Sequence, residues 1–193
     1  MPRLKQFNED AVLQKAMCIF WKNGYHATSI QDLVNGLGIN RASLYDTFGG
    51  KRALFDKTIQ QYITENNTNI AKFLASQPSV KAGFRALFTM AIDEAICDAD
   101  RKGCFVVNVT TELVPGDDEI QRLLDANRLS FEKLFFDYLS TGVERGEISS
   151  EKDLKSIARL LFTLHGGTMV IAKVNPDREK LLATVDTALL LLD

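Results

Sequence analysis

The chain has 193 residues, with 23 Lys and Arg against 25 Asp and Glu, a formal net charge of −2. Its apolar content of 46% and charged content of 25% are globular averages, which excludes disordered, collagen-like and coiled-coil fibrous classes. A chain of this length buries roughly 70% of its extended surface on folding, so its core needs no disulfide or metal. Cys18, Cys97 and Cys104 are unevenly spaced and predict neither a disulfide framework nor a zinc site.

Targeting and membrane signals are weak in this sequence. Uninterrupted apolar runs are shorter than the ~20 residues that span a bilayer. The first ten residues are too polar for a secretory signal peptide. We therefore expect a cytoplasmic protein with reduced thiols, no cofactor and no metal.

The average charge conceals an asymmetry along the chain. Residues 1–62 hold eight basic and five acidic side chains, a charge of +3. The other 131 residues hold 15 basic and 20 acidic side chains, a charge of −5. An imbalance of this size also arises by chance, but it is the pattern of a polyanion-facing N-terminal part.

Three short helices are expected first. Asn8 caps a helix that Gly24 ends, because asparagine is a favoured N-cap and glycine a favoured C-cap. Thr28 and Gln31 have the spacing of a capping box for a second helix, which ends at Gly38. Asn40 caps a third helix over residues 41–48, in which Leu44 and Phe48 face inward.

Longer helices are expected after the two glycines at 49–50. The pattern predicts helices over 51–75, 80–98, 117–146, from Ser150 onward, and from Asn175-Pro176 to Leu192. The segment 103–114 has the β-branched and aromatic residues of a strand, but a lone strand has no ladder partner, so it is predicted helical. The expected fold is all-α.

The second and third helices, joined by a turn containing Gly38, have the spacing of a helix-turn-helix. In that interpretation Arg41 offers a bidentate fork to guanine, while Ser43, Tyr45 and Thr47 reach phosphates or base edges. Lys51 at the start of the next helix, and Thr28 with Ser29 at the start of the second, offer phosphate seats. The alternatives are an ordinary helical turn and solvated surface charges.

These segments, GYHATSI at 24–30 and GINRASLYDTFGGKRALF at 38–55, resemble the TetR-like regulators. The resemblance implies a three-helix DNA-binding domain at residues 1–50, linked through helix 51–75 to a six-helix ligand-binding and dimerisation domain at 51–193. It implies phosphate contacts by Thr28, Tyr45 and Lys51, base reading by Arg41, Ala42 and Ser43, and a homodimer formed by the last two helices. Asp46 departs from the family pattern, so the operator sequence cannot be transferred.

The C-terminal part has many aromatic and polar residues on its inward faces. Nine of them are candidates for an effector cavity or, alternatively, ordinary core: Phe84, Phe88, Phe105, Asn108, Phe131, Phe135, His165, Thr168 and Met169. Asn108 has apolar flanks and needs a partner, which a ligand can supply. The Gly166-Gly167 pair fits either close helix approach or a kink.

Cys104 follows two cations and a glycine at a predicted helix start, a setting that favours the thiolate. The alternative is a small packing residue. With two His, no phosphate-binding loop and no paired carboxylates at a recognisable spacing, the sequence does not predict an enzyme. It predicts a repressor that binds a pseudo-palindromic operator as a homodimer and releases it on binding a small molecule, with oxidant or electrophile sensing through Cys104 as the alternative.

Overall fold

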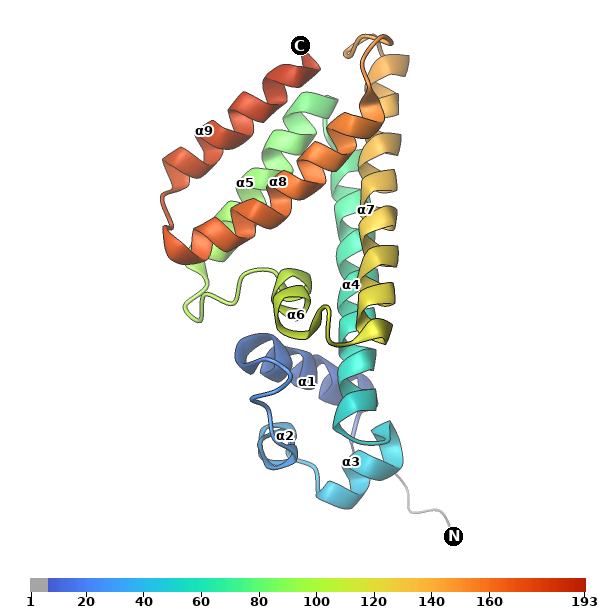
Figure 1. The fold of residues 1–193 in the computed structure, drawn as a ribbon, viewed down its shortest axis with the longest axis vertical. Coiled ribbons are helices and arrows are strands. Elements are labelled where there is room, and N and C mark those ends of the chain that lie inside the picture. The colour runs from blue at the N-terminus through green and yellow to red at the C-terminus, as the bar shows by residue number, and fades with distance from the viewer. Residues whose placement is uncertain (1–6) are drawn as a thin grey trace. The chain divides into compact units, whose positions relative to one another are not determined.

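The computed structural model describes residues 7–193, and in that range it contains helices and no strands (Figure 1). The prediction of an all-α fold is therefore confirmed. The helices are α1 (Glu9–Asn23), α2 (Ile30–Leu37), α3 (Arg41–Phe48), α4 (Lys51–Ala75), α5 (Val80–Cys97), α6 (Phe105–Leu113), α7 (Asp118–Glu144), α8 (Leu154–Val174), α9 (Arg178–Leu189) and the 3₁₀ turn η1 (Leu190–Leu192). Arg3 and Lys5, which contribute to the N-terminal charge, lie outside the described residues.

The chain forms two compact units, Met1–Thr64 and Glu65–Asp193, called here the head unit and the body unit. The division falls within α4, the helix expected to link the two domains. Phe55, in the second turn of α4, is fully buried and stacks edge-on against Phe20 of α1, with 5.2 Å between ring centroids. The first part of α4 therefore completes the core of the head unit.

The head helices begin and end where local chemistry dictates. Asn8 Oδ1 accepts from the Ala11 N–H at 3.0 Å, and Asn40 Oδ1 accepts from the Ser43 N–H at 2.8 Å, as predicted. Gly38 has φ +68° at the C-cap of α2, a left-handed conformation that glycine adopts without a Cβ clash. Asn40 and Gly38 together fix the turn between α2 and α3.

The capping box of α2 lies one residue later than the sequence analysis placed it. Ser29 Oγ accepts from the Asp32 N–H at 3.1 Å, and Asp32 Oδ2 accepts from the Ser29 N–H at 2.8 Å. Thr28 is buried and points away from this exchange, and Gln31 donates to Asn35. Both registers satisfy the spacing rule, and the burial of Thr28 selects the second.

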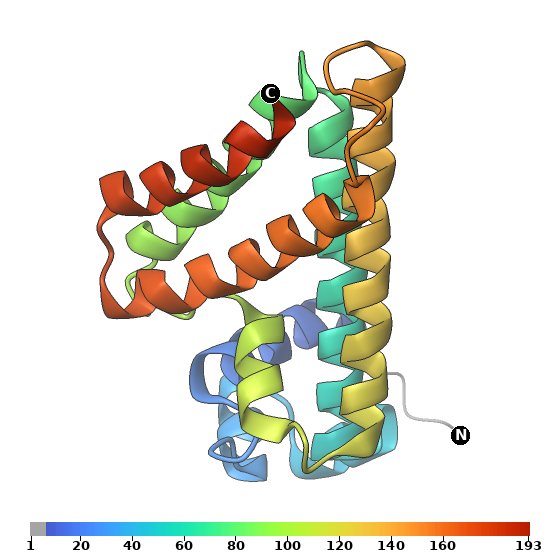
Figure 2. The same ribbon diagram turned by 45° about the horizontal axis from the view of Figure 1, so that its top comes forward.

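In the body unit, α5 packs against α8 and α9, and α7 packs against α8 (Figures 1 and 2). The last turns of α4 run alongside α7 in the same direction, as both views show. Asn67 Nδ2 of α4 donates to Asn127 Oδ1 of α7 at 3.1 Å, which joins the two helices. The centre of the unit is aromatic, with Phe84 and Phe135 edge-on at 5.0 Å.

Helix α6 forms despite its strand-like residues, as predicted. Phe105, Val109 and Leu113, at helical spacing, are buried along one face. Cys104 occupies the N-cap without a side-chain cap bond. The start of α6 is held instead by Asn108, whose Nδ2 donates to the Lys102 carbonyl at 2.8 Å.

Two helix starts differ from prediction. α8 begins at Leu154, after Ser150, because Asp153 Oδ1 accepts from the Ser156 N–H at 3.1 Å. α9 begins at Arg178, after Pro176, with Asp177 Oδ1 accepting from the Lys180 N–H at 3.2 Å. In both places the N-cap is an aspartate that lies a few residues after the predicted helix start. Its carboxylate also interacts favourably with the helix dipole.

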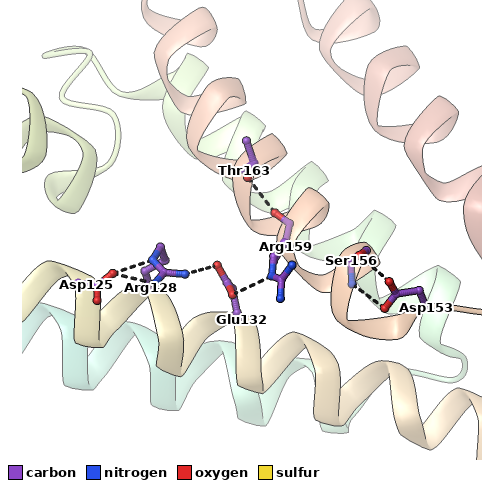
Figure 3. A network of polar contacts seen from close by, with 7 residues as sticks. All are labelled: Asp125, Arg128, Glu132, Asp153, Ser156, Arg159 and Thr163. Atoms are coloured by element: carbon purple, nitrogen blue, oxygen red, sulfur yellow. Dashed lines mark hydrogen bonds and ion pairs between the residues drawn. The ribbon is translucent and has the colours of Figure 1, made fainter.

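An ion-pair network joins α7 to α8 on the surface of the body unit (Figure 3). Arg128 Nη1 donates to Glu132 Oε1 at 2.8 Å, and Arg128 also pairs with Asp125. The other oxygen of Glu132 lies 3.8 Å from Arg159 Nε on α8. Glu132 thus bridges two arginines from different helices.

Candidate nucleic-acid interface and effector site

Helix α3 has one buried and one exposed face. Leu44 and Phe48 are buried, as predicted, and anchor the helix in the head unit. Arg41, Ala42 and Tyr45 are exposed, while Ser43 and Thr47 are half-buried. Among the described residues Arg41 has no ion-pair partner, so its guanidinium has not been neutralised within the chain. The helix-turn-helix therefore presents a polar, partly basic surface.

Tyr45 and Lys51 each contact a residue near the helix-turn-helix, Gly50 and Tyr25 respectively. The Lys51 ammonium lies 4.4 Å from the centroid of the Tyr25 ring, a cation–π distance. A Cβ on Gly50 would lie 3.2 Å from Tyr45 Cε1, and Gly50 has φ +114°, so this position takes glycine. In the sequence, the signal that could have identified Tyr25 is its place directly after Gly24, within the segment that resembles the family.

At the start of α2 the hydroxyl groups of Thr28 and Ser29 are both engaged within the chain. Thr28 is fully buried and its hydroxyl donates to the Gly24 carbonyl at 2.6 Å, so its side chain cannot reach a phosphate. The Ser29 hydroxyl donates to Asp32 Oδ2 at 2.6 Å. These Ser29 hydrogen bonds, with a smaller contribution from Lys51, lower the pKa of Asp32. A carboxylate already occupies this helix terminus, which leaves main-chain N–H groups of the first turn as donors.

The aromatic candidates of the effector site lie in the core of the body unit. Phe84, Phe88, Phe131 and Phe135 are buried, and Phe131 contacts Phe135 edge-on at 5.0 Å. The other three buried candidates are Phe105, Thr168 and Met169. Because Phe84 of α5 contacts Phe135 of α7 edge-on, these rings first of all hold α5 and α7 together.

Asn108 does not depend on a ligand for its hydrogen bonds. Besides its bond to the Lys102 carbonyl, its Oδ1 accepts from Lys173 Nζ of α8 at 2.6 Å. Asn108 therefore joins α6 to α8, and both ends of its amide find partners within the chain. Cys104 is half-buried and is a free thiol, not a disulfide half.

His165 differs from the other candidates because it is polar and sits among rings. Its imidazole centroid lies 6.0 Å from Phe88 and 5.9 Å from Phe131. Burial lowers the pKa of His165 to about 4, so the imidazole is neutral at physiological pH.

Comparison with known proteins places these features in a family. The model of bacterial regulatory proteins of the tetR family matches residues 12–58, and that of the tetracyclin repressor-like C-terminal domain matches residues 82–188. The chain belongs to the TetR family. It is therefore a helix-turn-helix transcriptional regulator, which confirms the predicted class and excludes the enzyme interpretation.

Two curated relatives match along nearly their whole length. The uncharacterised regulator YezE of Bacillus subtilis is 35% identical over all of both chains. The HTH-type transcriptional repressor ComR of Escherichia coli is 32% identical, over 97% of this chain and 90% of ComR.

A solved relative is a cysteine mutant of the TetR-family regulator CifR, complexed with a 26-base-pair double-stranded operator. It is 30% identical, covers 97% of this chain and 98% of its own, and has a TM-score of 0.86. Reduced NemR of E. coli, 17% identical with a TM-score of 0.82, shares the fold.

Proposed function

We propose that this TetR-family regulator is a cytoplasmic repressor that binds a pseudo-palindromic operator as a homodimer and releases it when a small molecule binds the body unit. The observation that carries the proposal is the outward face of α3, with Arg41, Ala42 and Tyr45 exposed over a buried Leu44. The repressor ComR and the operator complex of CifR support the same interpretation.

We assign roles on α3 and α4 from side-chain chemistry. Arg41 reads a base, since its fork matches the O6 and N7 acceptors of guanine, and Ala42 and Ser43 contact base edges beside it. Tyr45, Thr47 and Lys51 contact phosphates, which fix register without reading sequence. Asp46, exposed on the same helix, is an acceptor for cytosine N4 or a source of repulsion from phosphate.

The homodimer is supported by apolar side chains left exposed along α8 and at the end of the chain. These are Leu160, Val170, Ile171, Val174, Leu190 and Leu191. By length and composition α8 is apolar enough to cross a membrane, a test that the core helix of a soluble protein also passes. It packs against α5 and α7 on one side, so its remaining apolar surface fits a second copy. A Cβ on Gly166 or Gly167 would meet nothing within 4 Å, which leaves room for a partner helix.

Selection of bound DNA from a random pool tests the function and yields the operator. A palindrome with half-sites about 34–36 Å apart, or a multiple of that, is the expected result for a two-fold dimer. Recovery of no sequence above background would overturn the proposal.

Two head variants then separate phosphate contacts from base contacts. K51A should weaken binding to all DNA sequences and reduce the slope of log K against log salt by about 1. R41A should cost about 1–3 kcal/mol at one base pair per half-site and leave the other positions unchanged. K133A, the same change on an exposed lysine of the body unit, is the control and should leave the salt slope unchanged. A normal slope in K51A would remove Lys51 from the phosphate contacts.

A second candidate signal is oxidation or alkylation of Cys104. The thiol lies half-buried at the N-cap of α6 without a side-chain cap bond. Release of wild-type protein from its operator by a quinone or hypochlorite, and retention by C104S, is the expected pattern. Equal release of both proteins contradicts the idea.

A further inference from the structure

Asp46 lies at the centre of the outward face of α3. Successive side chains are turned by about 100° around an α-helix, so Leu44 and Phe48 each lie about 160° from Asp46, in opposite senses. Both of these residues are buried, whereas Asp46 is exposed. The position of Asp46 on the helix is therefore directly opposite the pair that anchors α3 in the head unit.

The residues that share this face with Asp46 have shorter side chains. Ala42 lies about 40° from Asp46 around the helix, and Ser43 about 60° on the other side. Ala42 is exposed and Ser43 is half-buried. A methyl or hydroxymethyl group extends less far from the backbone than the side chain of aspartate. The carboxylate is therefore the group that reaches furthest outward from the middle of α3.

Tyr45 and Thr47 lie on the two flanks of this face. Each is about 100° from Asp46 around the helix, in opposite senses. Tyr45 is 46% exposed and Thr47 is half-buried. A helix in the major groove meets base edges with its outermost side chains and the phosphates of the two strands with its flanks. With Tyr45 and Thr47 at the phosphates, Asp46 faces the base edges between them.

The Asp46 carboxylate is not neutralised within the chain. In the part of the chain that the structure describes, it has no hydrogen-bond or ion-pair partner. Arg41, on the same helix, lies about 140° around from Asp46, so the two side chains do not face each other. A carboxylate carried into the groove loses its hydration and meets the negative charge of the phosphates. It therefore weakens binding unless the DNA supplies a hydrogen-bond donor.

The four bases differ in what they offer a carboxylate in the major groove. Guanine presents two acceptors, thymine presents an acceptor and a methyl group, and adenine presents a donor beside an acceptor. Cytosine presents its N4 amino group, a donor with no acceptor on the same base. Because an ionised carboxylate accepts hydrogen bonds and donates none, its best match is cytosine.

We infer that Asp46 reads a cytosine in each half-site of the operator, by accepting a hydrogen bond from cytosine N4 at the middle of the surface that α3 presents to DNA. This inference rests on the proposed function, because it requires α3 to lie in the major groove. Of the two roles open to Asp46, contact with a base and repulsion from phosphate, the first follows from its position on the helix. Repulsion then adds to specificity, because it penalises sequences that offer no donor.

Parallel selections of bound DNA from one random pool, with full-length wild-type protein and with D46N, test the inference. Asparagine pairs with N6 and N7 of adenine, so D46N should replace cytosine by adenine at one position of each half-site and keep the other positions. Each protein should bind its own operator at least about fivefold more tightly than the other's, the effect of a mismatched base pair. Loss of folding does not produce a new preferred base. An unchanged consensus in D46N would overturn the inference.

Two further variants separate base reading from the effect of charge. D46A removes the acceptor and should leave that position of each half-site without a preferred base. D10N removes one negative charge at an exposed position of α1 and is the matched control, which should keep the wild-type consensus. If D46A binds every sequence more tightly by one factor and still prefers cytosine, the carboxylate acts by repulsion alone and the inference is wrong.

Failure of this inference is distinguishable from failure of the proposed function. A palindrome recovered by the wild-type protein, with a consensus that D46N and D46A leave unchanged, would reject Asp46 as a base contact and keep operator binding. Recovery of no sequence above background by the wild-type protein would reject operator binding, and the inference with it.

Discussion

In the head unit each short helix is capped by a side chain next to it, whereas in the body unit α6 begins without a side-chain cap and its own Asn108 is held by Lys173 of α8. Asn40 caps α3 from the adjacent position, but Asn108 and Lys173, 65 residues apart, secure the start of α6. The functional side chains follow the same division. Those of α3 point outward from a locally determined helix, while His165 is placed by rings from two other helices. Local rules therefore describe a DNA-facing surface better than they describe an effector site.

The strongest way to break this comparison is to remove a ring from the body core. F135A deletes a fully buried ring that contacts Phe84 and Phe131 edge-on, each at 5.0 Å. We expect a loss of about 3–5 kcal/mol in the free energy of unfolding, measured by urea denaturation followed by circular dichroism. L129A, at an exposed leucine of the same helix, should lose less than about 1 kcal/mol. A loss as small in F135A would show that the rings do not organise the body unit.

The second test is the pH dependence of the free energy of unfolding, to which His165 contributes. Its pKa in the folded protein is about 4, against an ordinary value of 6.5. Between these values the unfolded chain binds more protons, so stability should fall as pH falls from 6.5 towards 4, by up to about 3 kcal/mol. H165F should remove most of this slope, which chemical denaturation at several pH values will measure. The acidic side chains whose pKa values are lowered, such as Asp93 and Asp153, contribute below this window. An unchanged slope in H165F would mean that the imidazole is solvated.

The smallest expected effect on stability comes from the N-cap residues of α3 and α6. N40A removes the side-chain cap of α3 and should cost about 1 kcal/mol, seen as a lower denaturation midpoint and weaker operator binding. C104A occupies the equivalent position of α6, where no cap bond exists, so it should cost no capping energy. Equal losses in N40A and C104A would contradict the distinction between local and tertiary control.

Much of the fold follows from local patterns because caps and turns act within a few residues. The limits of α2 and α3 were predicted from Gly38, Asn40 and the inward pair Leu44 and Phe48. The same rules were ambiguous where two residues satisfy one spacing, as at Thr28 and Ser29, and where a nearer aspartate replaced the expected cap of α8. In these places burial and competing side chains decide, and a spacing rule contains neither.

The sequence by itself determined the all-helical class, the helix-turn-helix and the side chains that face outward from α3, because these depend on periodicity and short-range hydrogen bonds. Tertiary structure decided which of the predicted polar residues are satisfied. Thr28 turned inward, Asn108 found Lys173, and His165 was left neutral beside the rings of Phe88 and Phe131. The physical reason is that hydrogen-bond partners and desolvation depend on what packs against a residue, and those neighbours are distant in the chain.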